Sequence, residues 1–459
     1  MHLNGFWTAI LAAAWLTQLQ ADDQVRPNIL LIMADDLGWM DLHCQGNATL
    51  ETPALDQLAS EGIRFTDAYA ASPVCTPTRA SIMTGLSPAR LGITNHAPGQ
   101  PTYFDPKTRL LGAPWTTYLD LSYQTLAECL GVAGYRNGFV GKWHLSHHKG
   151  SDAAGRLEPR LRPEFQGFDS NIGGCDFGGP PSYFSPYRNP TIQDGAEGEY
   201  LPERLAQECI QFLEQPSAKP FFLCWWNYSV HYPIQAPQEL IEKYEQRPGV
   251  SRPAYHAMIE GMDQAIGKVI NHLESSGLSS NTLVVFTSDN GSLFENLPLR
   301  ENKGHLYEGG IRVPWIMRWP GKINPAQTSD LPIISSDLFP TLLAAGQYQP
   351  PNPSSLDGAN LLPWLLEGKP LEREALYFHY PNYAFHKQNR LGSAIRKGQH
   401  KLIHFYDDDS VELYDLKKDL SEKDDLSSSL PETARHLKSM LDQWRSRTRA
   451  RAPLRLAQP

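Results

Sequence analysis

Two short apolar runs, each followed directly by acidic and amide side chains, constrain the fold of this 459-residue chain more than any other feature. They cover residues 28–34 (NILLIMA) and 282–287 (TLVVFT). Continuous apolar runs of this length are typical of strands buried on both faces of a parallel sheet. The polar side chains that follow them are Asp35, Asp36, Asp289 and Asn290. Because open α/β sheets bind ligands at the carboxyl ends of their strands, we expect the two clusters to meet at one sheet edge.

These two clusters predict a metal site. Carboxylate and amide oxygens favour Ca²⁺ or Mg²⁺ over zinc. Either cluster alone is equally typical of an ordinary turn, because Asp, Asn and Gly are common turn residues. Two such clusters after two core strands favour the metal site. The six cysteines form no CxxC pair, which argues against a zinc ribbon.

The remaining periodicity predicts a large α/β domain. Thr52 before Pro53 predicts the N-cap of a helix over 52–62. Further helices are expected over 75–86, 124–134, 203–213 and 254–275, and further strands over 137–140 and 221–228. Residues 145–200 are rich in Gly, Pro and aromatic side chains and predict a long irregular region, which is usually functional.

The sequence pattern changes after residue 345, where several prolines near residue 350 indicate a linker. Short strands are expected over 376–380, 394–396, 401–405 and 412–414, with a final helix over 432–445. This pattern predicts a small antiparallel sheet with one packed helix. The chain is therefore divided into an α/β domain over 22–345 and a smaller C-terminal α+β subdomain over 346–459.

Composition limits the partners and the cellular location. Lys and Arg total 41 and Asp and Glu total 50, a net charge of −9 that argues against nucleic acid or an anionic membrane as partner. No internal run reaches the ~20 apolar residues that a membrane span needs. The apolar stretch 6–16, followed by Ala21, predicts a signal peptide over 1–21 and export to the periplasm or the medium. The alternative is a buried N-terminal helix.

A third motif, 75–81 (CTPTRAS), places a cysteine and an arginine at the start of a predicted helix. Pro77 fits the first turn, and Arg79 lies one turn beyond Cys75. A helix N-terminus binds anions, and a nearby cation lowers the pKa of a thiol. Taken alone, the motif predicts a nucleophilic cysteine beside an anion site.

The same motif resembles the signature of the type I sulfatase family, whose cysteine is oxidised to Cα-formylglycine (3-oxoalanine). Five further segments resemble family blocks in the family's order: 28–39 (NILLIMADDLGW), 52–70 (TPALDQLASEGIRFTDAYA), 141–145 (GKWHL), 288–291 (SDNG) and 301–314 (ENKGHLYEGGIRVP). The resemblance covers residues 27–345 strongly and the C-terminal part loosely. It implies the alkaline-phosphatase-like fold, an α/β/α sandwich with a mostly parallel central sheet.

The resemblance also implies a role for each motif residue. The implied metal ligands are Asp35, Asp36, Asp289, Asn290 and the residue derived from Cys75, with Ca²⁺ as the usual metal and Mg²⁺ as the less common one. The implied catalytic and sulfate-binding residues are Arg79, Lys142, His144, His231 and Lys303. Among them, His231 would protonate the leaving oxygen. His305 is expected to contact substrate, as are His147 and His148. Each lysine or histidine alone is more often a surface or structural residue.

The implied function is hydrolysis of a sulfate monoester, after a formylglycine-generating maturation enzyme has modified Cys75. The aromatic-rich regions 165–190 and 376–390 are expected to line the pocket and to suit a sulfated carbohydrate. In the second region the residues are Tyr377, His379, Tyr380, Tyr383 and His386. One alternative is a phosphonate monoester or phosphodiester hydrolase of the same superfamily. Another is a glycan-binding pseudoenzyme, which would lack a core residue, whereas none is missing.

Overall fold

The computed structural model of the protein describes residues 26–99, 103–147, 159–350 and 352–457. The predicted signal peptide and His148 lie outside these residues. Among the described residues, no helix combines the length and the apolar character required to span a bilayer.

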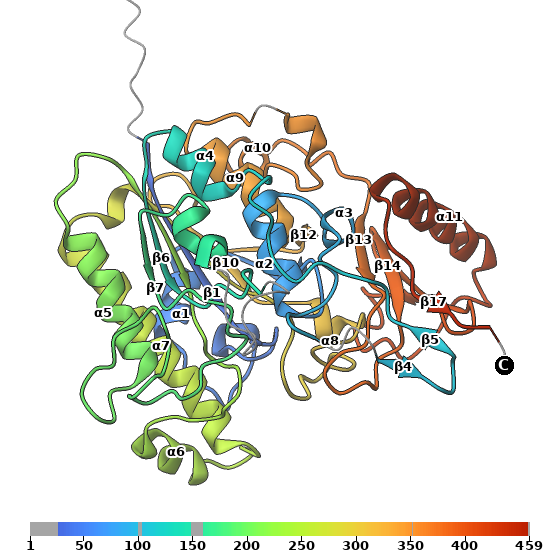
Figure 1. The fold of residues 1–459 in the computed structure, drawn as a ribbon, viewed down its shortest axis with the longest axis horizontal. Helices are drawn as coiled ribbons and strands as arrows, with labels where there is room; N and C mark the ends of the chain where they lie inside the picture. Colours follow the sequence, from blue (N-terminus) through green and yellow to red (C-terminus); the bar gives the residue numbers. More distant parts are fainter. Residues whose placement is uncertain (1–25, 100–102, 148–158, 351, 458–459) are drawn as a thin grey trace, which may run out of the picture.

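An eight-stranded, mostly parallel sheet forms the centre of the molecule (Figure 1). Its order is β11 (Gln327–Ser329), β2 (Ile63–Phe65), β10 (Trp315–Arg318), β9 (Thr282–Ser288), β1 (Asn28–Ala34), β8 (Phe221–Trp226), β6 (Arg136–Gly141) and β7 (Ser170–Ile172). Strand β1 pairs in parallel with both β8 and β9, whereas β10 is antiparallel to its neighbours. The two runs predicted as core strands are therefore direct neighbours.

Alternating side chains of β1 divide the core into two layers. Leu30 and Ile32 contribute to one apolar cluster, and Leu31 and Met33 to the other. Helices α1 (Pro53–Ser60), α5 (Leu201–Glu214) and α7 (Pro253–Ser275) cover the first face. Helices α2 (Cys75–Thr84), α4 (Leu126–Val132), α9 (Leu338–Ala345) and α10 (Leu362–Glu367) cover the second (Figure 1). This confirms the predicted α/β/α sandwich.

The start of α1 is capped differently from the prediction. The Thr52 side chain makes no capping hydrogen bond to α1. Instead the carboxylate of Asp263, on α7, accepts hydrogen bonds from the backbone N–H groups of Ala54 and Leu55 at 3.0 and 2.8 Å. A side chain from a distant helix thus satisfies the free N–H groups, which no local sequence signal indicates.

The C-terminal part forms a four-stranded antiparallel sheet, as the sequence predicts. Its strands are β13 (Leu376–Tyr380), β14 (Gly392–Lys397), β15 (His400–Phe405) and β16 (Val411–Asp415). Helix α11 (Pro431–Thr448) packs on its outer face through Leu437, Leu441 and Trp444 (Figure 1). The inner face packs against Tyr69 and Ile311 of the α/β part.

The remaining elements are short. They are α3 (Pro88–Leu91), α6 (Gln238–Glu245), α8 (Glu308–Ile311), the pair β3 (Ala68–Tyr69) and β12 (Ile333–Ile334), and the three-stranded sheet of β4 (Phe104–Asp105), β5 (Leu110–Leu111) and β17 (Leu454–Arg455). Residues 159–200 are mostly irregular, as predicted, although β7 lies within them.

Candidate active site

The polar residues that follow β1 and β9 lie side by side at the carboxyl edge of the sheet. Ala34 is paired with Ser288, so Asp35 and Asp289 are the next residues along the two strands. The backbone N–H of Asp289 donates to the carbonyl of Ala34 at 3.2 Å. The backbone N–H of Asp36 in turn donates to Oδ1 of Asp289 at 3.1 Å. The predicted meeting of the two clusters at one edge is therefore observed.

Each of the three buried carboxylates faces a cationic side chain. Lys142 Nζ lies 2.5 Å from Asp35 Oδ2, and Lys303 Nζ lies 2.6 Å from Asp36 Oδ1. The third pair is Arg79 and Asp289, joined at 2.6 Å. Buried charges are retained only when they are paired in this way. These pairs bring together residues from four distant parts of the chain.

Two buried oxygens in this cluster, Asp35 Oδ1 and Asn290 Oδ1, accept no hydrogen bond, although Arg79 Nη2 lies 3.6 Å from Asp35 Oδ1. The amide nitrogen of Asn290 donates to Asp36 Oδ1 at 2.8 Å, which leaves its oxygen free. One ligand atom from each of Asp35, Cys75 and Asp289 lies within 4.8 Å of the other two. Unpartnered buried oxygens are rare and costly, so this group fits a cation that prefers oxygen ligands.

The pKa values of Asp35 and Asp36 shift in opposite directions. Burial and the neighbouring Asp289 raise the pKa of Asp35. Burial also opposes ionisation of Asp36, but Lys303, His231 and Lys142 together outweigh it and hold the pKa of Asp36 well below its usual range. Asp36 therefore keeps its charge although it is completely buried.

Cys75 is the first residue of α2 and lies beside His144. Its Sγ is 3.4 Å from Nδ1 of His144, whose Nε2 lies 2.6 Å from the carbonyl of Ala97. Because a carbonyl only accepts hydrogen bonds, Nε2 carries the proton and Nδ1 faces the thiol as an acceptor. Burial raises the pKa of Cys75, more than the nearby lysines lower it. The prediction of a thiol activated by its helix N-terminus is therefore wrong for the unmodified side chain.

Backbone geometry explains the glycine of the GKWHL segment. Gly141 has φ +104°, and a Cβ there would lie 1.9 Å from the carbonyl oxygen of Trp226. The next residue, Lys142, donates its N–H to that same carbonyl at 2.7 Å. Asp36 and His144 also adopt left-handed conformations, with φ +65° and +58°. Such conformations in non-glycine residues are uncommon and cluster at functional sites.

His231 reaches the same cluster from the loop after β8. Its Nδ1 lies 2.9 Å from the carbonyl of Tyr232, so that nitrogen carries a proton, and Nε2 lies 3.7 Å from Asp36 Oδ2. Burial and the positive charge of Lys303 lower the pKa of His231 to about 3. The next residue, Tyr232, is half exposed at the rim.

The predicted substrate-contact histidines lie in different places. His305 stacks on His386, with ring centroids 4.8 Å apart, beside the Lys303 segment. His147 lies 3.8 Å from Asp176, which does not belong to the carboxylate cluster. The structure therefore brings His305 to the edge of the site.

Two residues predicted to line the pocket face away from it. The Tyr377 ring stacks on Trp444 of α11, with centroids 5.0 Å apart and ring planes 5° apart. His379 is buried between the hydroxyl of Ser393 and the carbonyl of Arg451. Side chains alternate along a strand, so these odd-numbered residues of β13 point to the α11 side, whereas Tyr380 points to the α/β part.

Sequence reasoning missed His96. Burial, with the charges of Lys303 and Lys142, lowers the pKa of His96 to about 4. The adjacent Ala97 accepts from His144, as described above, and its N–H donates to Thr76 Oγ1 at 3.1 Å. Nothing in the segment TNHAP distinguishes this residue from an ordinary loop histidine.

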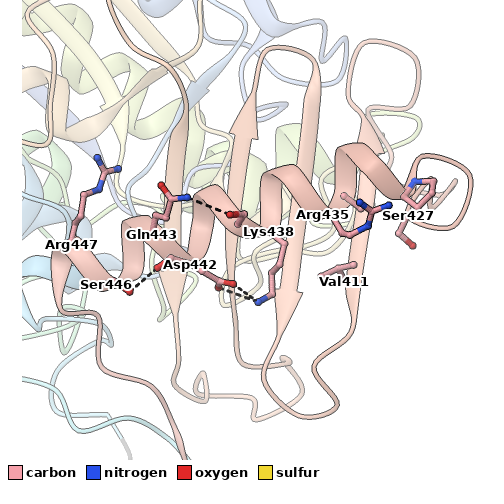
Figure 2. Close-up of a pocket in the computed structure, with 11 residues that line it drawn as sticks. Val411, Ser427, Arg435, Lys438, Asp442, Gln443, Ser446 and Arg447 are labelled. Atoms are coloured by element: carbon pink, nitrogen blue, oxygen red, sulfur yellow. Dashed lines mark hydrogen bonds and ion pairs between the residues drawn. The ribbon is translucent and has the colours of Figure 1, made fainter.

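A separate groove of about 850 Å³ lies along α11 (Figure 2). Arg435, Lys438 and Asp442 line it, and Lys438 is paired with Asp442 at 2.9 Å. None of the predicted site residues lines this groove. The candidate active site is therefore the sheet-edge cluster.

Comparison with known proteins agrees with this geometry. The family model "Sulfatase" matches residues 27–348, and the model "N-sulphoglucosamine sulphohydrolase, C-terminal" matches residues 301–447. The N-acetylgalactosamine-6-sulfatase of Mus musculus is 34% identical over 402 residues, which are 80% of this chain and 72% of that protein. Arylsulfatase A of Homo sapiens is 33% identical over 475 residues, 90% of this chain and 87% of that protein.

The fold of this chain is also similar to that of a solved structure. The crystal structure of Ps i-CgsB in complex with k-i-k-neocarrahexaose has a TM-score of 0.75 and 27% identity, covering 91% of this chain and 92% of that chain. The family match covers most of the α/β part, and the relatives extend over most of the chain. The chain therefore belongs to the sulfatase family of the alkaline-phosphatase-like superfamily, and it is a hydrolase of sulfate esters.

Proposed function

We propose that the protein hydrolyses sulfate monoesters of a sulfated carbohydrate, with a Cα-formylglycine made from Cys75 and a Ca²⁺ ion. The observation that carries this proposal is the convergence of Cys75, three buried carboxylates and three cationic side chains at one sheet edge. A sulfate ester is an anion, and a local cluster of cations lets an overall acidic protein bind it.

Asp35, Asp36, Asp289 and Asn290 are the residues proposed to hold the Ca²⁺ ion, together with residue 75. The two unpartnered buried oxygens support this assignment, and an all-oxygen donor set suits Ca²⁺. When present, Ca²⁺ supplies positive charge to the sulfate group and the hydrated formylglycine supplies the nucleophilic hydroxyl.

The cationic side chains bind and orient the ester. Lys142 and Lys303 are the proposed sulfate ligands, since each presents a buried ammonium group to the cluster. Their charge stabilises the negative charge that develops when the ester bond breaks. Arg79 holds Asp289 and residue 75 in position from within α2.

Two histidines are placed to move protons. His144 Nδ1 faces the side chain of residue 75 and is the proposed acceptor of its proton. His231 Nε2 faces the cluster from the opposite loop and is the proposed site of proton exchange with the leaving oxygen. Nδ1 of His231 is held by the carbonyl of Tyr232, which orients the ring.

A carbohydrate substrate is supported by the rim of the site and by the relatives. Tyr232 and Phe385 are half exposed there, and exposed aromatic rings suit the apolar faces of sugars. One relative is named for a sulfated amino sugar, and the solved neighbour was crystallised with k-i-k-neocarrahexaose.

Export belongs to the same proposal. The sequence of residues 1–21 has the apolar stretch and small residue of a signal peptide, so we propose that a maturation enzyme modifies Cys75 and that the protein is periplasmic or secreted. The proposed mature chain has a catalytic domain over 22–345 and a C-terminal subdomain over 346–459. N-terminal sequencing of the exported protein tests the cleavage site.

The deciding experiment measures sulfate release from a panel of sulfated mono- and oligosaccharides. The protein is produced with a formylglycine-generating enzyme, and mass spectrometry of the residue 75 peptide confirms the conversion. A phosphonate monoester and a phosphate diester are measured in parallel, with Cys75→Ala as control. Faster turnover of the phosphorus substrates would favour the alternative hydrolase. Binding of the sugars without turnover by the converted protein would identify a pseudoenzyme.

A further inference from the structure

His96 has an unpaired ring nitrogen and lies between Asn95, which contacts Tyr383, and Ala97, which contacts His144 of the site. Its Nδ1 lies 3.0 Å from Asn95 Oδ1, so that nitrogen donates and Nε2 is left as an acceptor. Among the described residues Nε2 has no hydrogen-bond partner, and the ring is partly exposed. The charged groups that act on it are Lys303, Lys142 and Asp36. The free acceptor therefore lies on a residue at the border of the candidate active site.

Phe385 provides an exposed aromatic face next to the same lysine. Its ring is 47% exposed, and its centroid lies 5.7 Å from Lys303 Nζ. The ring packs edge-on against His386, with centroids 4.8 Å apart. His386 Nε2 in turn lies 3.1 Å from the carbonyl of Lys303, so the aromatic ring and the lysine belong to one packed unit.

The loops that carry these two residues are fastened to each other. Tyr380 Oη donates to Asn95 Oδ1 at 3.0 Å, and Asn95 Nδ2 donates to the carbonyl of Tyr383 at 3.1 Å. One residue earlier, Thr94 Oγ1 donates to Asn382 Oδ1 at 2.7 Å. The side chain of His96 is therefore held at a fixed position relative to the loop that bears Phe385.

We infer that His96 and Phe385 form a sugar-ring subsite beside Lys303. In this subsite the Phe385 ring packs on the apolar face of the sugar whose sulfate lies at Lys303, and His96 Nε2 accepts a hydrogen bond from a free hydroxyl of that ring. An aromatic face and a neutral acceptor select a ring with hydroxyl groups rather than one with a second anionic group at this position. The inference rests on the proposed function and specifies the substrate class of its site.

Matched variants separate this role from binding of sulfate. His96→Phe keeps the ring and removes both nitrogens, whereas His96→Gln keeps a hydrogen-bonding group. Phe385→Ala removes the aromatic face, and Phe385→Trp keeps one. His436→Ala, at an exposed position of α11, serves as the control. Each converted variant is assayed with the sulfated sugar that the wild type cleaves fastest, and inorganic sulfate is used as a competitive inhibitor.

We expect His96→Phe and Phe385→Ala each to raise KM for the sugar roughly tenfold, as loss of one hydrogen bond or one stacking contact predicts. The Ki of inorganic sulfate should stay within about twofold of wild type, because the sulfate contacts are intact. His96→Gln and Phe385→Trp should recover most of the loss.

Two results would overturn the subsite. One is an unchanged KM in both loss variants, and the other is a Ki for sulfate that rises as much as KM. If the wild type releases sulfate from no sugar in the panel, the proposed function fails and the subsite fails with it. Wild-type turnover together with unaffected variants refutes the subsite alone.

Discussion

Two nitrogens of Arg79 donate hydrogen bonds to a single oxygen of Asp289. Nε and Nη2 of Arg79 lie 2.9 and 2.6 Å from Asp289 Oδ2, and both side chains are completely buried. The third nitrogen, Nη1, donates to the carbonyl of Lys142 at 2.7 Å. Arg79 thus joins α2, the carboxyl end of β9 and the lysine segment after β6. The second oxygen of Asp289 remains directed toward Asp36.

Replacement of Asp289 tests the metal assignment. Asp289→Ala should lose both bound calcium and turnover, because it removes a proposed ligand. It also breaks a buried ion pair and leaves Arg79 only its 3.6 Å contact with Asp35, so the free energy of unfolding should fall by about 3–5 kcal/mol. Elemental analysis, turnover and denaturant unfolding measure the three effects. Asp330→Ala, at an exposed position, is the control, and full calcium occupancy in Asp289→Ala would contradict the assignment.

Replacement of Cys75 separates chemistry from folding. Cys75→Ala should abolish turnover and change the free energy of unfolding by only about 1–2 kcal/mol, since the side chain is small. Cys75→Ser should also fail to turn over, because a serine ester has no second hydroxyl to expel sulfate. Cys129→Ala, at a buried thiol in α4, should keep full activity. Measurable turnover by Cys75→Ala would exclude formylglycine chemistry.

A buried ion triad holds the segment that carries Lys303. Lys401 Nζ lies 2.9 Å from Glu308 Oε1 and 2.8 Å from Glu422 Oε1, and all three side chains are fully buried. Lys401→Met should lower the free energy of unfolding by about 3–5 kcal/mol, because Glu422 loses its cation and Glu308 keeps only its pair with Arg312. The exposed Lys417→Met is the matched control.

Adding Glu422→Gln to Lys401→Met should recover part of that stability, since the double variant has one fewer unpaired charge. Denaturant unfolding of the two single variants and the double variant gives the coupling energy. A loss below about 1 kcal/mol in Lys401→Met would show that the triad contributes little.

His379 is expected to make the protein sensitive to acid. Burial lowers the pKa of His379 to about 4, whereas the unfolded chain binds this proton near its ordinary pKa of ~6.5. Between these values the unfolded state holds more protons, so stability falls as pH falls from 6.5 to 4, by up to about 3 kcal/mol. His379→Gln should be less stable at pH 8 but lose less on acidification. Parallel slopes for both proteins between pH 4 and 8 would refute this.

The central sheet and its polar edge could be predicted because their signals are local. A strand buried on both faces has a continuous apolar run, and residues 28–34 and 282–287 are such runs. Parallel strands share one carboxyl edge, so Asp35 and Asp289 had to lie on the same side once both strands were assigned. Their direct adjacency depended on strand order, which periodicity does not give; the resemblance implied only that these residues share one metal site.

Other features depended on contacts between distant segments. His96 lies in a loop, and only the fold brings its neighbours Asn95 and Ala97 into contact with Tyr383 and His144. Asp263 caps α1 from α7, across more than 200 residues. Tyr377 is different, because the alternation of side chains along β13 separates it from Tyr380 and could have been used to exclude it from the pocket.

The fastening of Thr94 and Asn95 to the loop after β13 has a consequence for how such enzymes diversify. The residues assigned to ester cleavage belong to the α/β part, whereas the segment that contacts Thr94 and Asn95 follows a strand of the C-terminal sheet. Residues 381–389 could be exchanged with those of a relative without changing Asp35, Asp36 or Asp289, provided that the contact of residue 386 with the Lys303 carbonyl is kept. The preference for one glycan over another can then change during evolution, while the residues that cleave the ester stay the same.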